Sequence, residues 1–420
     1  MKQLIATRII FAAFLLFFPA TCYRTYANSA DSLFQHSISF RDYLNIVGKE
    51  NLNLLIEKYH IKIADANIVA AKVMPDPEIA FEGADESYEV ALSYNLELGN
   101  KRGARIRVAR SEAELTNLLV EHFFQELRAE STDAYLNAIL QRELLATKKS
   151  SYEYMLQLSI SDSLRFRLGE VNENDARQSK LEAATLLNEV FRQEAEYKSS
   201  LAVLNLYMCK SSDILILSTP SGQWNDFERE YELMALISIA LDNRIDLIAA
   251  QKSNELAVNQ LKLVKAERRM DLGLSIGYER DWKGVFPNHD MMKAGISIPL
   301  KFSNINKGST RAAQYAIEQS RYEEQKTRLQ IQTEVSQAYY LYDAAKKQVK
   351  QYKLGLFEDS KKVLDGIVYK YKRGETTILD VLIAQRTYNE VQEQYLRIMK
   401  EYASSLVNLQ KVCGIWDIEF

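Results

Sequence analysis

The sequence predicts a mostly α-helical fold with a small β part, built from a duplicated unit of two strands followed by a long helical hairpin. The first observation is the scarcity of helix-breaking residues. The 420 residues include 15 glycines and 6 prolines, about half and about a third of average usage. The second observation is an internal repeat, and the third is a set of short segments in which polar and apolar residues alternate.

The repeat relates positions that are 205 residues apart. Its clearest match is Arg165–Glu170 (RFRLGE) with Lys370–Glu375 (KYKRGE), and in the same register Asp175 matches Asp380. Further identities are Glu196 and Tyr197 with Glu401 and Tyr402, Ser199–Leu201 with Ser404–Leu406, and Leu204 with Leu409. Agreement at glycine, aspartate, tyrosine and a Ser-Ser-Leu run in one register indicates a duplication rather than chance similarity between helices.

The duplication sets the expected domain organisation. We expect a signal peptide over 1–27, a first repeat over 28–209, a linker over 210–230 and a second repeat over 231–420. The strands are expected at about 77–98 and 272–300, and the helical hairpins at about 103–208 and 308–413. A helical stretch is expected before each strand pair, over Leu44–Lys72 and Tyr231–Met270.

The N-terminus has the pattern of an export signal. Lys2 and Arg8 provide positive charge, Ile9–Phe18 is an apolar run, and Thr25–Ala27 fits a cleavage site with small flanking residues. Lipidation at Cys22 is the alternative interpretation. The apolar run is too short to span a bilayer as a helix, so we expect an exported mature chain without a transmembrane helix.

Composition argues against several classes of function. The net charge of −3 gives no reason to expect nucleic-acid binding. Four scattered histidines and two mature cysteines, Cys209 and Cys413, show no metal-ligand spacing. The two cysteines could form a disulfide in an oxidising compartment or remain thiols. We find no catalytic or phosphate-binding motif, and we expect no enzyme activity, no cofactor and no metal site.

The predicted strands have one apolar and one polar face. The residues expected to face lipid are Leu92, Tyr94, Leu96, Leu274, Ile276, Ile296 and Ile298. A sheet that covers a soluble core would show the same alternation. Three observations favour a membrane instead: the strands are long enough to cross it when tilted, the chain carries an export signal, and the opposite face is small or charged, as in a lumen.

Four strands cannot close a barrel within one chain, because a closed barrel needs about eight. Open strand edges are not tolerated in lipid. A membrane location therefore requires an oligomer, and three copies give a 12-stranded transmembrane β-barrel.

The two helical stretches are too long for a compact domain. A helix of about 50 residues extends ~75 Å, whereas globular helices average about 11–12 residues. Each stretch is expected to fold back as a hairpin that packs as a coiled coil. Gly169 and Gly374 are the candidate turn residues, with Asn172 or Asn174 and Thr376 or Thr377 as candidate helix starts. A glycine at a helix end can serve only the backbone turn.

Several of these segments resemble one family. Tyr371–Arg386 (YKRGETTILDVLIAQR) resembles the second tip motif of TolC-type outer-membrane efflux proteins, and Arg165–Asp175 resembles the first. Asn243–Leu247 (NRIDL) is similar to the family's Arg-Pro-Asp-Leu element, with Ile245 in place of proline. Ile296–Leu300 (ISIPL) resembles the entry to its last barrel strand. The resemblance covers nearly all of the mature chain in order.

The resemblance implies a passive exit duct in the outer membrane of a Gram-negative-type cell. It implies a homotrimer whose β-barrel continues as a periplasmic α-helical barrel. Partners would be a periplasmic adaptor, an inner-membrane pump of the resistance-nodulation-division type, and outer-membrane lipid. Leu168, Gly169, Arg373 and Gly374 would lie where the adaptor docks.

The resemblance also implies a gate at the periplasmic end. Asp380 occupies the family's acidic lumen position, and Asp175 and Thr376 are the other candidate gate residues. Asp175 could instead act as a helix cap. Ile383 stands where relatives often have a second aspartate, and Thr376 stands where some have a basic residue.

The alternative function is a periplasmic helical scaffold or stalk. It accounts for the helices and the repeat, but not for four alternating strands at matched places in the two halves. The sequence does not indicate which substrate is exported.

Overall fold

The computed structural model describes residues 36–85, 87–209, 217–224, 229–282, 289–300 and 306–418. The predicted signal peptide, Cys22 and most of the longer strand loop lie outside these residues. The elements are β1 (His36–Ile38), α2 (Phe40–Glu50), α3 (Leu52–Ala71), β2 (Glu78–Gly83), β3 (Ser87–Leu96), α4 (Lys101–Arg167), α5 (Glu173–Met208), β4 (Ser218–Pro220), α6 (Leu233–Asn243), α7 (Ile245–Glu267), β5 (Leu272–Asp281), β6 (His289–Ser297), α8 (Lys307–Gln351), the π-helical turn η2 (Tyr352–Leu356), α9 (Phe357–Lys372) and α10 (Ile378–Cys413). The predicted fold class, mostly helical with a small sheet part, is confirmed.

The chain divides into two compact units, one formed by residues up to Tyr43 with Asn137–Gln223, and one by Leu44–Leu136 with Trp224 onward. In the first unit, the end of α4 packs against α5. Gln193 Nε2 donates to Gln141 Oε1 over 2.6 Å, and Lys148 Nζ lies 2.7 Å from Glu189 Oε2. The apolar side chains of Leu144, Met155, Leu201, Leu204 and Met208 are buried. This hairpin is held by apolar packing with polar cross-links between the two helices.

A short strand pair in the first unit was not expected from the sequence. β1 pairs in parallel with β4, with His36 opposite Ser218 and Ile38 opposite Pro220. The cluster of serine, proline and glycine within Lys210–Glu230 predicts a linker there. Residues 210–216 and 225–228 lie outside the described chain. Because the pair joins segments that are far apart in the sequence, local composition could not reveal it.

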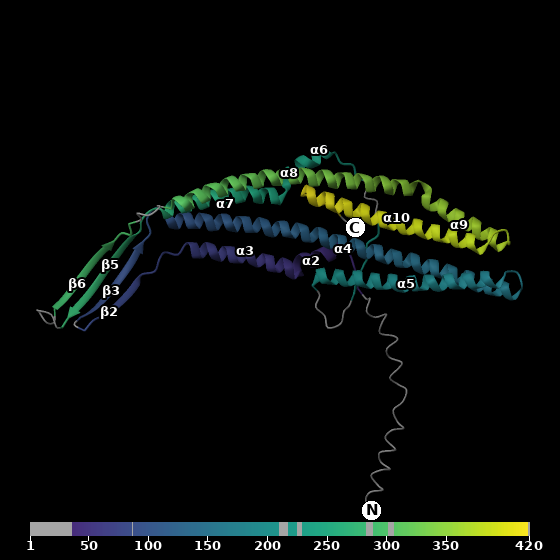
Figure 1. The fold of residues 1–420 in the computed structure, drawn as a ribbon, viewed down its shortest axis with the longest axis horizontal. Helices are drawn as coiled ribbons and strands as arrows, with labels where there is room; N and C mark the ends of the chain where they lie inside the picture. The colour runs from purple at the N-terminus through teal and green to yellow at the C-terminus, as the bar shows by residue number, and fades with distance from the viewer. Residues whose placement is uncertain are drawn as a thin grey trace, which may run out of the picture. The chain divides into compact units, whose positions relative to one another are not determined.

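The second unit contains a four-stranded antiparallel sheet with the order β2-β3-β5-β6 (Figure 1). The register places Leu92 opposite Ile276, and Leu274 opposite Ile296. Side chains alternate between the two faces of a strand, so this register gathers most of the large apolar residues of the four strands on one face. β2 and β6 are the edge strands of the described sheet.

The helices of this unit follow the order of the strands. α3 precedes β2, α4 follows β3, α7 precedes β5 and α8 follows β6. Arg102 at the start of α4 donates to the carbonyl of Lys72 after α3, over 2.7 Å, and Asn259 of α7 donates to Ser111 of α4 over 2.8 Å. α7 in turn packs on α8. Figure 1 shows α3, the first part of α4, α7 and α8 as neighbours in one row, with α3 and α8 at its two sides.

Both helical stretches before the strands are interrupted, where the sequence suggested continuous helices. Asn51 caps α3 by accepting a hydrogen bond from the Leu54 amide over 3.1 Å. Arg244 separates α6 from α7 in an extended conformation, with φ −70° and ψ 123°. Helix boundaries of this kind depend on one or two residues, so the periodicity of apolar residues does not reveal them. No helix in the described part of the chain is long and apolar enough to cross a membrane.

Candidate functional sites: two helical turns, a two-faced sheet and a charged pocket

The first helical turn lies between α4 and α5. Gly169 has a φ of 78°, and the amide of Glu170 donates to the carbonyl of Arg165 over 2.9 Å. This six-residue hydrogen bond with a left-handed glycine is the Schellman end of a helix. Asn172 then begins α5 by accepting from the Asp175 amide over 2.8 Å. The side chain of Leu168 is exposed beside the glycine.

The second turn, between α9 and α10, repeats this geometry. Gly374 has a φ of 74°, and the amide of Glu375 donates to the carbonyl of Lys370 over 3.0 Å. Thr377 caps α10. Arg373 extends along its own helix, donating to the Tyr369 hydroxyl over 3.0 Å. The two predicted turn positions thus adopt the same conformation.

Both turn glycines have open surroundings. A Cβ built at Gly169 or Gly374 meets no other heavy atom of the described chain within 4 Å. Glycine is therefore required for the positive φ, which other L-residues adopt only at a cost, and not for packing within the chain. The open side leaves room for another backbone to approach. Docking of an adaptor at Leu168, Gly169, Arg373 and Gly374 remains a prediction.

Asp380 closes a capping box at the start of α10. Its carboxylate accepts from the Thr376 hydroxyl over 2.5 Å, and from the Thr377 hydroxyl and amide over 2.7 Å and 3.1 Å. These hydrogen bonds stabilise the charged form, and they hold the pKa of Asp380 below its usual value. Asp175 has the corresponding place in the first turn, where its carboxylate accepts from the Asn172 side chain over 2.9 Å.

The gate residues therefore have a local structural role, which the sequence offered as an alternative only for Asp175. The lumen role of Asp380, Asp175 and Thr376 remains a prediction. Leu379 and Ile383, one helical turn apart on α10, are both exposed. The start of α10 thus presents large apolar side chains next to a carboxylate that is bound to its own turn.

The apolar face of the sheet is exposed in the single chain. Its apolar members are Ile79, Phe81, Tyr88, Val90, Leu92, Tyr94, Leu96, Leu272, Leu274, Ile276, Tyr278, Met292, Ala294 and Ile296. Phe81 and Ile296 are 76% and 72% exposed.

The predicted end of the last strand is wrong. β6 ends at Ser297, so Ile298 lies beyond the strand, and Ile296–Leu300 marks the end of β6 and not its entry. Pro299 has no amide hydrogen to donate to the ladder.

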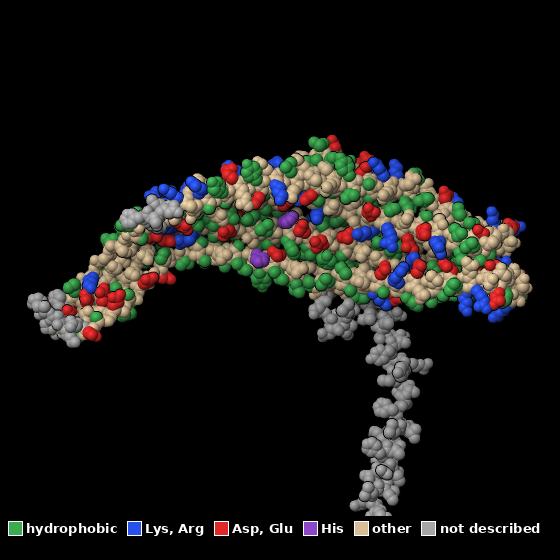
Figure 2. Space-filling view, in the orientation of Figure 1, with side chains coloured by type: hydrophobic (Ala, Val, Ile, Leu, Met, Phe, Trp, Pro, Cys, Tyr) green, Lys and Arg blue, Asp and Glu red, His purple; other side chains and the backbone are tan. Residues whose placement is uncertain are grey.

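The polar face carries small residues near the helices and charged residues near the strand loops. Ser93, Ser275 and Gly295 occupy one level across three strands, and Asn95, Gly273 and Ser297 occupy the next. Towards the loops, Glu89 lies opposite Glu279. Figure 2 shows acidic side chains gathered at this end of the sheet.

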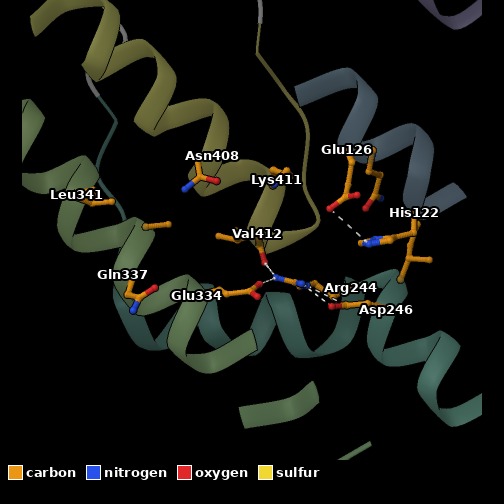
Figure 3. Close-up of a pocket in the computed structure, with 13 residues that line it drawn as sticks. His122, Glu126, Arg244, Asp246, Glu334, Gln337, Leu341, Asn408, Lys411 and Val412 are labelled. Carbon is orange, nitrogen blue, oxygen red and sulfur yellow. Dashed lines mark hydrogen bonds and ion pairs between the residues drawn. The ribbon is translucent and has the colours of Figure 1, made fainter. Parts of the chain in front are cut away.

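A charged pocket of about 390 Å³ lies where α4, α7, α8 and α10 meet (Figure 3). Arg244 is at its centre. The guanidinium donates to Asp246 over 3.0 Å, to Glu334 over 2.5 Å and to the carbonyl of Val412 over 3.4 Å. Because these partners lie at the start of α7, in α8 and at the end of α10, Arg244 joins three helices.

In the sequence, Arg244 stands out only as part of the Asn243–Leu247 element, and no role for it could be predicted. The position of Arg244 at a helix start, two residues before Asp246, was the only sequence feature that could have indicated this ion pair. Ile245 is the first residue of α7, a position at which proline is well tolerated, so replacing the family's proline preserves the turn. His122 and Glu126 lie 3.8 Å apart at the pocket rim. Within the described residues, no group of three or more histidine, cysteine or acidic side chains could hold a metal ion.

The two cysteines of the described chain occupy equivalent helix ends. Cys209 is the left-handed cap of α5 with φ 50°, and Cys413 is the last residue of α10. Both are thiols and do not form a disulfide in the described chain. Burial raises the pKa of the Cys413 thiol to about 11.

Comparison with known proteins tests this resemblance. Residues 236–415 match the model of the family described as outer membrane efflux protein. Over 386 residues the chain is 21% identical to the cobalt-zinc-cadmium resistance protein CzcC of Cupriavidus metallidurans, and the match covers 88% of each chain. These findings confirm the resemblance to TolC-type outer-membrane efflux proteins.

Solved structures share the fold. The CmeC outer membrane channel of Campylobacter jejuni superposes with a TM-score of 0.74 at 15% identity, over 89% of this chain and 85% of CmeC. A membrane protein from Pseudomonas aeruginosa gives a TM-score of 0.75 at 17% identity, over 89% of this chain and 92% of that protein. The arrangement of long helices and a small sheet is therefore that of known outer-membrane channels.

Proposed function

We propose that this chain, a member of the outer membrane efflux protein family, acts as the homotrimeric exit duct of a tripartite efflux system. In the proposed assembly, three sheets close into a 12-stranded barrel in the outer membrane, and the helices continue as a tube into the periplasm. The observation that carries the proposal is the four-stranded sheet, which has one exposed apolar face and two edge strands.

The sheet explains why one copy is insufficient. An exposed apolar face is stable in lipid, but unpaired backbone groups along β2 and β6 are costly there. Pairing β6 of one copy with β2 of the next satisfies both edges. This contact joins two different surfaces of the chain, and such head-to-tail contacts form a closed ring when the rotation closes. Three copies give a closed barrel with a polar interior.

The helices next to these edges support the same contact. On α3, the side chains of Leu52, Ile56, Tyr59 and Ile63 are exposed, with the four-three-four spacing of a coiled-coil seam. On α8, Tyr315, Tyr322 and Leu329 are exposed at intervals of seven. α3 and α8 lie at the two sides of the helix row, so each stripe can cover the other in a neighbouring copy.

The partners follow from the two helical turns. We propose that an adaptor protein in the periplasm docks at Leu168 and Gly169 and at Arg373 and Gly374. The left-handed glycines and their open surroundings support this assignment, because they permit close approach of a second backbone. The adaptor would connect the duct to an inner-membrane pump of the resistance-nodulation-division type, which supplies the energy.

Cross-linking within the outer membrane tests the assembly. In a background of Cys209→Ser and Cys413→Ala, cysteines replace Ile63 and Tyr315. α3 and α8 run in opposite directions along the row, and these positions lie at similar distances from the sheet, so oxidation should produce dimers and trimers. The matched control combines Ile63→Cys with Leu329→Cys. Position 329 is displaced by about 21 Å along α8, so this pair should not form cross-links.

If both cysteine pairs give only monomers, and the protein is found in a soluble periplasmic fraction, the scaffold alternative would be favoured.

A further inference from the structure

At the charged end of the sheet's polar face, one lysine, Lys293, pairs with two glutamates. These contacts are called the Lys293 bridge. Glu82, Glu89 and Glu279 lie side by side on β2, β3 and β5. Lys293 of β6 lies opposite Gly277, one level closer to the helices. The three carboxylates and the ammonium group therefore occupy adjacent positions on one face.

Lys293 contacts two of the carboxylates directly. Its Nζ donates to Glu89 Oε2 over 2.9 Å and forms an ion pair with Glu279. β5 lies between β3 and β6, so the contact with Glu89 has to pass over β5 at Gly277. A Cβ built at Gly277 would lie 3.1 Å from Glu89 Oε1. Glycine at this position leaves the space through which the bridge forms.

The bridge counters a local repulsion. Glu89 and Glu279 are directly opposite on neighbouring strands, and like charges in this arrangement destabilise a sheet. On the described strand residues of this face, Lys293 is the only lysine or arginine. The carboxylates of the face are Glu78, Glu82, Glu89, Glu279 and Asp281. The side chain of Lys293 is 42% exposed, so its charge acts on the solvent above the face as well as on its partners.

We propose that Lys293 limits the preference of the duct's outer mouth for small cations over anions. The inference rests on the proposed function, because the polar face lines a lumen only when three sheets close with their apolar faces toward lipid. At about 0.1 M salt the screening length is ~10 Å, so carboxylates on the mouth raise the local concentration of cations. In each copy, Lys293 offsets part of this negative charge.

Ion selectivity of the full-length protein in planar bilayers tests this role. Reversal potentials are measured across a potassium chloride gradient with about 0.1 M salt at the mouth. Lys293→Met should raise the cation-to-anion permeability ratio by about twofold or more, because the charge it removes is weakly screened at this ionic strength. Glu89→Gln combined with Glu279→Gln should lower the ratio. Both differences should vanish near 1 M salt, where the screening length is about 3 Å.

Two variants serve as matched controls. Arg280 lies at the same end of the sheet but on the apolar face, opposite Tyr88, and its Nε is 3.7 Å from Asp290. Arg280→Met therefore removes the same charge without altering the lumen, and it should leave the permeability ratio unchanged. Lys293→Arg keeps the charge and should retain the wild-type ratio. Migration as a heat-sensitive trimer in mild detergent shows that each variant is assembled.

The outcomes separate this role from the duct itself. A conducting Lys293→Met pore with the wild-type permeability ratio would overturn the selectivity role and leave the duct standing. An equal shift in Arg280→Met would also overturn it, because net charge and not lumen position would then be responsible. A wild-type protein that does not conduct would overturn the duct, and the role of Lys293 with it.

Discussion

The two helical hairpins of the duplicated chain end in the same turn but reach it in different ways. Gly169 and Gly374 are both left-handed, and Asn172 and Thr377 both cap the following helix. α4, however, is continuous over 67 residues, whereas α8 ends after 45 residues and continues through η2 into α9. The duplication has kept the turn and changed the helix that leads to it.

The break between α8 and α9, which α4 lacks, is centred on one residue. Gly355 in η2 has a φ of 118° and a ψ of −2°, a conformation that favours glycine. The residue 205 positions earlier is Ser150, within continuous α4. Figure 1 shows α9 leaving the line of α8 at this point. A π-helical turn with non-helical backbone is a recognised cause of a helix kink.

Contacts with α10 hold the break from both sides. The hydroxyl of Tyr352 donates to Gln394 over 2.9 Å, and the ring of Phe357 lies 5.8 Å from that of Tyr388. The second hairpin is therefore bent at a defined place, while the corresponding part of α4 is regular helix. The two hairpins show that the same turn can follow either a continuous helix or a helix that is broken before it.

The largest expected effect tests whether the two turns share a docking function. Gly374→Trp should leave trimers in the outer membrane and abolish export, because the indole fills the open side of the turn. Gly169→Trp should act in the same way. Export is measured in cells in which this chain is the sole duct, together with its own adaptor and pump.

Gly366→Trp provides the control for bulk. Gly366 lies in α9, away from the turn, and a Cβ there meets no other heavy atom of the described chain within 4 Å. This variant should export normally. Unimpaired export by Gly374→Trp would place the docking surface elsewhere.

The break at Gly355 gives the next largest effect. Gly355→Ala places a side chain at a strongly disfavoured φ and should destabilise the protein by about 1–3 kcal/mol. Gly366→Ala, in regular helix, should stabilise it by about 0.5–1 kcal/mol. Denaturant unfolding of the detergent-solubilised protein measures both. Equal effects of the two substitutions would show that Gly355 does not define a break.

Removing a cap should have a smaller effect. Thr377→Ala removes the hydroxyl that caps α10 and should cost about 0.5–2 kcal/mol of stability. Hydrogen–deuterium exchange should increase in the first turn of α10 and remain unchanged at the start of α5. Exchange that rises equally in both turns would indicate that the effect is global.

Asp380→Asn examines the same cap through its pH dependence. Because the pKa of Asp380 is lowered in the folded state, its stabilising contribution is present above the unfolded pKa of about 3.9 and is lost as the pH falls through the lower folded value. The stability difference between wild type and Asp380→Asn should therefore shrink as the pH falls below about 4. A constant difference down to pH 2 would contradict the capping role.

The smallest effect concerns the far ends of the hairpins. Cys209 adopts the left-handed cap at which the second repeat has Gly414, with φ 68°. Cys209→Gly should therefore stabilise the protein by about 1 kcal/mol, as measured by denaturant unfolding.

At pH 8 a maleimide should not label Cys413 until the protein unfolds, because this thiol is buried and has a raised pKa. Labelling of native Cys209→Ser protein would contradict the burial of Cys413.

Features encoded by a few neighbouring residues could be predicted from the sequence. Alternation placed the strands and identified their apolar face, because it reports directly on which side chains share a face. Gly169 and Gly374 were found because the repeat aligned them, and the nearby asparagine and threonine residues indicated helix starts. The resemblance to TolC-type outer-membrane efflux proteins followed from the same turn motifs, and the comparisons with known proteins support it.

Features that depend on contacts between distant residues were not predicted. Gly355 and Gly366 look alike in the sequence, yet one breaks a helix and the other lies within a regular one. Tyr352 and Phe357, on the two sides of Gly355, contact residues of α10 that lie far away in the sequence. The cross-link made by Arg244 and the bridge made by Lys293 each require partners from elements far apart in the chain. Alternation continues through Ile298, so it could not show that β6 ends one residue earlier.

The central claim is that three copies of this chain form a conducting duct in the outer membrane. The most direct measurement is the mass of the protein purified from outer membranes in mild detergent, followed by single-channel recording in a planar bilayer. The proposed function predicts a trimer with a small, mostly closed conductance. A soluble periplasmic protein that does not conduct would contradict it, and would mean that the apolar face of the sheet packs against protein instead of lipid.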